Sequence, residues 1–458
     1  MAPQTLIDEV VSAGWILPVR VRPGGTGAPA VLDTGPVSQD PAPPVALDGA
    51  SPDLRKTLSR LWPAEEGVLV TAGPVPAGYD LVEEYLALPS PGRARYLVPA
   101  APRRAAAAAL LRYNALRLPR VRAGRAVLGT VLRVGRPPGA GTVRVAVHRG
   151  LPADRRAEAL LVRHLEGALG VPVLVGTGVR PDHPNLKPTL QLLDRRGDPV
   201  GFAKLGAGPG TDRLVLHEAA VLAGLPAHVR SALGAPALLH SGRWRGRPLL
   251  VTSPLPSDLR RHPDFDEVPP YGLTATLAGV QATTARLAAS DYWAGTARRI
   301  GAVTDPAEAD LRQALLAHHD AIRARWGDRP IELGWWHGDW APWNVGWSGS
   351  RIAVWDWEYA AAGVPKGMDL AHWHFQVGFV MRKEEPDVAM AAVDRLLPGT
   401  AADLGVDRET ARCLAELYLV EAALRHHELA AAGGGWTESF RPGVLRALTG
   451  RAARLSAR

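Results

Sequence analysis

The chain has few of the residues that build covalent or metal cross-links. Among its 458 residues Cys413 is the single cysteine, so an internal disulfide and a cysteine-based zinc site are both excluded. The sequence contains no run of about 18 apolar residues, and we therefore expect no transmembrane helix. No basic region followed by an apolar core begins the chain, so we expect no signal peptide and a cytoplasmic protein.

Lysine is also scarce. The chain has 5 lysines against 48 arginines, and its high content of Ala, Arg, Gly and Pro indicates a compositional bias of the coding genome. The total number of arginines is therefore weak evidence for any function, whereas a lysine at a functional position is informative. The length predicts two or three domains.

Acidic residues are missing from one long stretch. Between Tyr85 and Ala153 there are thirteen arginines and no Asp or Glu, so this stretch carries +13 while the rest of the chain sums to −5. The basic character is thus local. Two interpretations stay open: a solvated surface, or a docking face for an anionic acceptor, glycan or acidic membrane. Nucleic acid is disfavoured because few aromatic residues interleave the arginines.

We expect this stretch to form an α/β domain over residues 76–153, after a partly irregular N-terminal segment over residues 1–75. The pattern predicts a strand at Arg95–Val98, a helix at Arg103–Leu116, an Arg-rich turn, and strands near Val131 and Val143. A docking face would include four arginines of the turn region: Arg117, Arg120, Arg122 and Arg125.

The segment Trp336–Asn344 and the segment Val354–Glu358 contain the most informative pattern in the chain. Asn344 follows Asp339 by five residues, and Asp356 follows Asn344 by twelve. The first segment is too rich in Gly, Pro and Trp for a regular helix, and Arg351–Val354 reads as a buried strand. Phosphoryl transfer uses such a set: a carboxylate orients the acceptor hydroxyl, and an amide oxygen with a second carboxylate holds Mg²⁺.

A kinase also needs a lysine on a strand and a glutamate on the following helix. Lys204 lies in Gly201–Leu205, which reads as the second strand of a hairpin, and Glu218 follows fourteen residues later in a helical pattern. For each residue taken alone, a solvated position is the simpler interpretation. Together with the downstream loop, the pair predicts a phosphate-binding lysine held by a glutamate.

These motifs resemble those of the aminoglycoside phosphotransferase and choline kinase family, over roughly residues 155 to 450. The resemblance is carried by the pattern H-x-D-x-x-x-x-N starting at His337, by Gly338, and by Trp-Glu after Asp356. A dozen residues separate Asp356 from Asp369, which leaves no room for the activation loop of protein kinases. The resemblance implies an α+β, bilobal protein-kinase-like fold. A small β-sheet N-lobe (154–256) and a mainly helical C-lobe (257–458) would follow the extra α/β N-terminal domain.

The resemblance also implies roles for individual residues. In the C-lobe it makes Asp339 the catalytic base, supported by His337, and assigns Mg²⁺ to Asn344 and Asp356, with Asp369 as a structural brace. The cofactor, ATP, would be bound by the N-lobe and the interlobe hinge. Its predicted ligands are Lys204, Glu218, the phosphate-covering loop with Gly176, Gly178 and Lys187, and the hinge backbone at Ser253 and Leu255. For the loop, a polar hairpin without ligand contacts stays an equal alternative.

Tryptophan is concentrated around the proposed site, where eight of fourteen lie between Trp335 and Trp373. Trp340 and Trp343 are candidates to face the acceptor, with Glu358 a weaker one; the alternative is that these tryptophans fill the core. We expect helices at Leu273–Ala289, Ala307–Arg325 and Arg408–Leu429, the last capped by Asp407.

The sequence thus predicts an ATP- and Mg²⁺-dependent phosphotransferase that acts on a hydroxyl of a small molecule. The acceptor is left open among a sugar, a nucleoside, an aminoglycoside and a secondary metabolite, since fold alone does not fix the substrate. The alternative is a nucleotide-binding, pseudokinase-like module without turnover, which acts through a partner bound by the basic N-terminal domain. The sequence leaves the oligomeric state open.

Overall fold

The computed structural model describes residues 49–63, 65, 67–181, 186–261, 268, 271–434, 436 and 439–457. It divides into two compact units. The first comprises the residues up to Leu216 and Ala237–Asp258, and the second comprises His217–Pro236 and the residues from Leu259 onward. Most of the predicted N-terminal segment (1–48) and residues 182–185 of the predicted phosphate loop lie outside the described residues.

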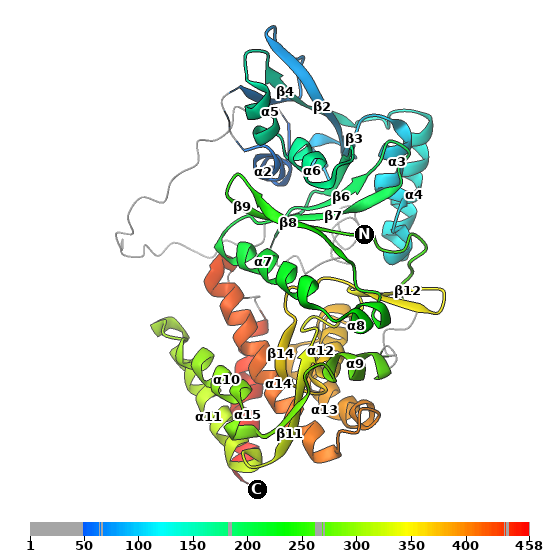
Figure 1. Ribbon diagram of the computed structural model, residues 1–458. Coiled ribbons are helices and arrows are strands. Elements are labelled where there is room, and N and C mark those ends of the chain that lie inside the picture. The colour runs from blue at the N-terminus through cyan, green and yellow to red at the C-terminus, as the bar shows by residue number, and fades with distance from the viewer. Residues whose placement is uncertain are drawn as a thin grey trace, which may run out of the picture. The chain divides into compact units, whose positions relative to one another are not determined.

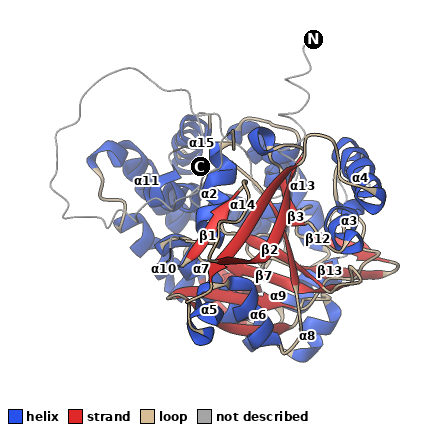
Figure 2. Ribbon diagram, turned by 90° about the horizontal axis from the view of Figure 1, so that it is seen from above, coloured by secondary structure: helices blue, strands red, loops and turns tan. Residues whose placement is uncertain are grey.

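In the described part of the chain, the first unit is built around one antiparallel sheet of nine strands in the order β1-β4-β2-β3-β5-β6-β7-β9-β8 (Figures 1 and 2). The β3–β5 pairing, with Tyr96 opposite Gly178, joins the strands of the Arg-rich stretch to those of the predicted N-lobe. The strands are β1 Val68–Thr71, β2 Tyr79–Leu88, β3 Tyr96–Pro99, β4 Gly141–His148, β5 Leu174–Gly178, β6 Thr189–Leu193, β7 Pro199–Leu205, β8 Leu238–Trp244 and β9 Arg247–Thr252.

Helices cover both faces of this sheet because neighbouring strand residues point to opposite sides. Leu97 belongs to a core cluster with Leu58 and Leu165, whereas the adjacent Val98 belongs to a second cluster with Leu110. Helices α3 and α4 lie side by side over the second face (Figure 1). The helices are α2 Pro52–Leu61, α3 Arg103–Leu111, α4 Pro119–Val134, α5 Ala153–Ala159, α6 Leu161–Leu169 and α7 Pro209–Gly224, the last continuing into the second unit.

The predicted strand near Val131 is wrong, because this region belongs to helix α4, which also includes Arg120, Arg122 and Arg125 of the predicted Arg-rich turn. Pro119 is well placed at the start of this helix, where its missing N–H costs nothing. Val121, Arg125 and Leu132 then follow at helical spacing and are buried. The predicted strand near Val143 is confirmed by β4, and the predicted helix from Arg103 ends at Leu111.

The second unit is mainly helical, so the predicted combination of a sheet-rich part and a helical part is confirmed. Its helices are α8 Ala227–Ala232, α9 Tyr271–Ala278, α10 Asp291–Gly301, α11 Ala309–Trp326, α12 Met368–Gln376, α13 Pro386–Ala402, α14 Arg408–Leu429 and α15 Phe440–Ser456. Its strands are β10 Thr283–Arg286, β11 Pro330–Trp336, β12 Val345–Ser348, β13 Arg351–Val354 and β14 Ala361–Pro365. None of the described helices has the length and apolar character needed to cross a bilayer.

Two of the three helices predicted in this unit are confirmed by α11 and α14, and the side chain of Asp407 caps α14 by accepting two backbone N–H groups. The helix predicted at Leu273–Ala289 is wrong beyond Ala278. Gly279 and the left-handed Gln281 interrupt it. The β-branched residues Thr283 and Thr284 then begin strand β10, which pairs with β11.

Candidate active site

The catalytic loop predicted from the sequence spans the gap between two strands. β11 ends at Trp336 and β12 begins at Val345, as the Gly, Pro and Trp content indicates. Asp369, at the start of α12, accepts the backbone N–H of His337 at 2.8 Å through one carboxylate oxygen and that of Gly338 at 3.0 Å through the other. Asp369 therefore braces the loop. Its burial raises the pKa of the Asp369 carboxyl to about 6, although both N–H groups act to lower it.

Both carboxylate oxygens of Asp339 accept a hydrogen bond from another side chain. The Asn344 amide nitrogen donates to Oδ2 at 2.6 Å, and the imidazole Nε2 of His372 lies 3.0 Å from Oδ1. The Asp339 side chain is still 15% exposed. Each oxygen has a second lone pair, so the carboxylate can also accept a hydrogen bond from a substrate hydroxyl.

The orientation of Asn344 fits a metal ligand. Its two amide hydrogens point to Asp339, one to Oδ2 and one to the backbone carbonyl at 3.0 Å. The side-chain oxygen Oδ1 is consequently turned away from Asp339, is fully buried, and has no hydrogen-bond partner among the described residues. A buried acceptor without a partner is costly, and a bound cation would satisfy it.

Carboxylates gather close to the end of strand β13. The backbone N–H of Trp355 donates to the Asn344 carbonyl at 3.1 Å, which ties this strand end to the catalytic loop. Oxygen atoms of Glu218, Asp356 and Glu358 all lie within 4.8 Å of one another, and Glu218 and Glu358 are almost completely buried. Oxygen ligands of this kind suit Mg²⁺. The structure thus places Glu218 and Glu358 beside Asp356, although the sequence indicated a lysine-holding role for one and an acceptor role for the other.

His337 is fully buried and supports the loop from within. Its Nδ1 accepts the backbone N–H of Asp339 at 3.2 Å, and its ring packs edge-on against Trp357 at 4.7 Å. Burial lowers the pKa of His337 to about 4, so the ring is neutral at pH 7. Trp340 also contacts this ring and is fully buried, as expected from the alternative in which these tryptophans fill the core. Trp343 is half-buried and stays an acceptor candidate.

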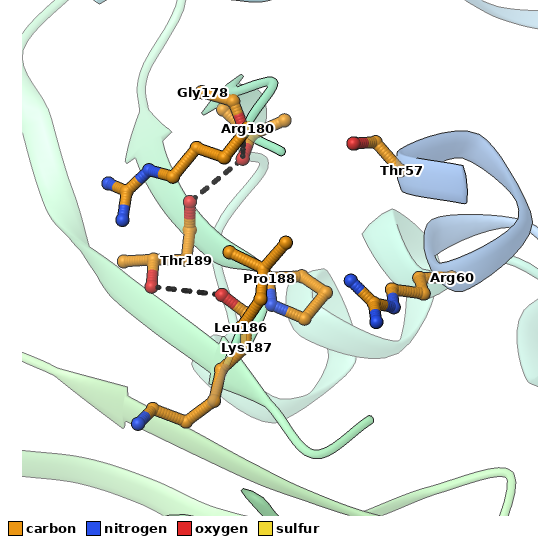
Figure 3. Close-up of a pocket in the computed structure, with 9 residues that line it drawn as sticks. Thr57, Arg60, Gly178, Arg180, Leu186, Lys187, Pro188 and Thr189 are labelled. Carbon is orange, nitrogen blue, oxygen red and sulfur yellow. Dashed lines mark hydrogen bonds between the residues drawn. The ribbon is translucent and has the colours of Figure 1, made fainter. Parts of the chain in front are cut away.

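The predicted phosphate loop is described at both ends, within the first unit. Gly178 and Lys187 line a pocket that also includes Arg180, and helix α2 contributes Thr57 and Arg60, which the sequence did not indicate (Figure 3). The positive charges of Arg60, Arg180 and Lys187 in this lining favour the binding of an anion.

Gly176 and Lys204 are two further predicted site residues in the first unit. Gly176 does not reach the pocket: a side chain there would lie 3.0 Å from the Cβ of Ala109, so the glycine allows close packing of helix α3 against the sheet. Lys204 lies on β7, opposite Thr189 of the neighbouring strand β6, as the hairpin pattern predicts.

The two hinge residues already have partners within the first unit. The backbone N–H of Ser253 donates to the carbonyl of Ala237 at 2.8 Å, and the carbonyl of Leu255 accepts the phenolic hydroxyl of Tyr113 at 2.7 Å. The Tyr113 ring lies 5.3 Å from the ring of Phe202 on β7. A base that bonded the Ser253 N–H or the Leu255 carbonyl would therefore have to share or displace these contacts.

Several residues around Asp339 have no counterpart in the sequence prediction. His372 bonds Asp339, the Tyr418 hydroxyl bonds His372, and Arg425 donates to the Gly338 carbonyl at 2.6 Å. For His372 the helical spacing from Asp369 was the available signal, since residues three apart lie on one face of a helix. Tyr418 and Arg425 lie on α14, and no local pattern links that helix to the loop.

No protein-family model and no curated protein matches the chain. Solved structures are similar to parts of it. A thermostable mutant of aminoglycoside phosphotransferase APH(4)-Ia, in a complex with ADP and hygromycin B, has 14% identity and a TM-score of 0.43, covering 65% of this chain and 98% of that one.

Two further structures belong to other kinases. A choline/ethanolamine kinase family protein from Mesorhizobium loti has 17% identity and a TM-score of 0.32, covering 59% of this chain and 84% of that one. Glucosamine kinase has 18% identity and a TM-score of 0.33, covering 68% and 88%. These similarities are partial, so the chemistry of the site is inferred from the residues of this chain.

Proposed function

We propose that the protein is an ATP- and Mg²⁺-dependent phosphotransferase that moves the γ-phosphoryl group to a hydroxyl of a small molecule. The observation that carries the proposal is the pairing of Asp339 with Asn344. One side-chain amide holds the carboxylate that would act as base and leaves its own oxygen buried and open to a cation. A base next to a cation-binding oxygen is what phosphoryl transfer requires.

In this proposal Asp339 accepts the proton of the acceptor hydroxyl as that oxygen attacks the phosphorus. Asn344 and Asp356 are the residues that would hold Mg²⁺, and Glu358 and Glu218 lie close enough to Asp356 to add oxygen ligands. When bound, Mg²⁺ would neutralise charge on the nucleotide phosphates. Lys204 is proposed as a phosphate ligand, and Lys187 as a second one. The acceptor class stays open among sugars, nucleosides, aminoglycosides and secondary metabolites.

The test is a phosphorylation screen. A metabolite and aminoglycoside pool is incubated with the protein and ATP·Mg²⁺, and mass spectrometry detects acceptors that gain one phosphoryl group. The same screen is run with Asp339→Asn, which should cut turnover by on the order of 10²-fold or more while ATP binding persists. Asp328→Asn, at a side chain that is 96% exposed, is the matched control and should behave like the parent.

The outcomes separate the two candidate functions. A phosphorylated acceptor that disappears with Asp339→Asn supports the phosphotransferase. ATP-dependent thermal stabilisation without product across the panel would instead favour a nucleotide-binding module. Equal turnover of Asp339→Asn and the parent would remove Asp339 from the mechanism.

A further inference from the structure

A chain of three side chains runs from helix α14 to the proposed base. The hydroxyl of Tyr418 lies 3.0 Å from Nδ1 of His372, and Nε2 of the same ring lies 3.0 Å from Oδ1 of Asp339. Tyr418 and His372 are each 2% exposed. Water therefore has little access to either bond. The side chain of Gln376 also hydrogen-bonds the Tyr418 hydroxyl.

The proton positions in this chain follow from what each atom can donate. An ionised Asp339 is an acceptor only, so Nε2 of His372 must carry a hydrogen. Burial lowers the pKa of His372, which keeps the ring neutral and leaves Nδ1 without a hydrogen. The Tyr418 hydroxyl must then donate to Nδ1. One tautomer of His372 is thereby selected by the tyrosine behind it.

The other contacts of Asp339 leave its carboxylate little freedom to rotate once the His372 bond is present. Oδ2 is held by Asn344, the backbone N–H of Asp339 is held by His337, and the preceding carbonyl is held by Arg425. The His372 bond is the one that fixes Oδ1. Without it, rotation about the Cβ–Cγ bond of Asp339 would be restrained on one side only.

We propose that His372 and Tyr418 are positioning residues for the catalytic base, with Tyr418 holding His372 in the tautomer that donates to Asp339. The inference rests on the proposed function of Asp339. Neither side chain needs to touch substrate. Their contribution is to keep the carboxylate turned so that its free lone pairs face the acceptor hydroxyl.

The first test is kinetic. His372→Leu should lower kcat by about 10- to 100-fold, the scale of a misplaced catalytic group, with an unchanged KM for ATP. His372→Gln places an amide N–H near the position of Nε2 and should recover most of kcat. His374 provides the control, because it is buried in the same helix α12 but bonds Thr400 at 3.0 Å. His374→Leu and His374→Gln should lower the melting temperature by similar amounts and leave kcat near that of the parent.

The second test concerns Tyr418. Tyr418→Phe should reduce kcat by a smaller factor than His372→Leu, and should have no added effect in the His372→Leu background, since residues in one chain are not additive. Multiplying effects in the double variant would contradict the chain. Equal kcat losses in His372→Leu and His372→Gln would also contradict it. If the His374 variants lost as much kcat as the His372 variants, the role of His372 would be merely structural.

A third measurement needs no turnover and separates this inference from the proposed function. The ¹⁵N shifts of His372, identified by comparison with His372→Gln, should report the neutral Nε2–H tautomer in the parent and a changed tautomer ratio in Tyr418→Phe. A Nδ1–H tautomer, or an imidazolium at neutral pH, would overturn the inference even if phosphotransfer is found. If no acceptor is phosphorylated while the Nε2–H tautomer is observed, the proposed function fails and the hydrogen-bond chain stands as described.

Discussion

Gly338→Ala offers a sharp test of how tightly the catalytic loop is built. Gly338 has φ +77°, a conformation that costs an L-residue roughly 1–2 kcal/mol. A Cβ there would overlap the carbonyl oxygen of Tyr359 and lie 2.8 Å from its carbonyl carbon, so backbone must move. Overpacking adds about 1–3 kcal/mol, and we expect a total loss of unfolding free energy of about 2–5 kcal/mol.

The same shift should reach the base, because Gly338 directly precedes Asp339 and both of its backbone polar groups are bonded, one to Asp369 and one to Arg425. A displacement of about 1 Å at a catalytic group can cost on the order of 10²-fold in rate. We therefore expect kcat to fall by about that factor, whereas the overall fold persists.

Urea unfolding and steady-state kinetics measure the two effects, with Gly363→Ala as the matched control. Gly363 also has a positive φ, +70°, but a Cβ there meets no atom of the described part of the chain within 4 Å. Its replacement isolates the cost of the backbone conformation, about 1–2 kcal/mol, without a clash. If Gly338→Ala and Gly363→Ala lose the same stability and keep the same kcat, the loop is not held as tightly as these contacts indicate.

Three further variants test other parts of the structure. Asp356→Ala should abolish the Mg²⁺-dependent thermal shift produced by ATP, and Asn344→Ala should weaken it less, because an amide supplies one neutral ligand; a full shift in Asp356→Ala would exclude this residue as a ligand. Lys204→Met should raise the apparent KM for ATP and lower kcat; normal kinetics would transfer the phosphate-binding role to another cation. Arg125→Gln should lower the melting temperature, since this buried guanidinium donates to the carbonyls of Leu110 and Ala109, whereas the exposed Arg122→Gln should not; equal melting temperatures would refute the structural role.

The elements predicted well are those whose pattern is local. The strand Arg351–Val354 follows from a short apolar run, and α14 from a capping aspartate followed by apolar residues at helical spacing. The loop between β11 and β12 follows from its Gly, Pro and Trp content, and its proposed catalytic role rests on the residue types and spacing that phosphoryl transfer needs. In each case the deciding interactions lie within about twenty residues of sequence.

The elements that were missed depend on partners far away in the chain. His372 and Tyr418 are 46 residues apart, and Tyr113 and Leu255 are 142 apart. A histidine in an apolar helix and a tyrosine in another are each compatible with ordinary core packing. The tertiary fold selects which polar groups meet, and a single sequence does not show that selection. The β3–β5 pairing, which joins the Arg-rich stretch to the following strands, likewise depends on the tertiary fold and is not visible in a single sequence.

The Arg-rich stretch shows why counting charge does not locate a binding face. Arg125 is 8% exposed, lies over the Tyr96 ring at 5.2 Å and donates to two carbonyls, so its charge serves the packing of α4 against α3. Arg117 is half-buried, and burial, with neighbouring arginines, lowers its pKa to about 9. Of the four arginines assigned to a docking face, Arg120 and Arg122 are exposed. Any anion recognised here would meet a smaller positive surface than the thirteen arginines imply, because a buried guanidinium such as that of Arg125 presents little of its surface to solvent or to a partner.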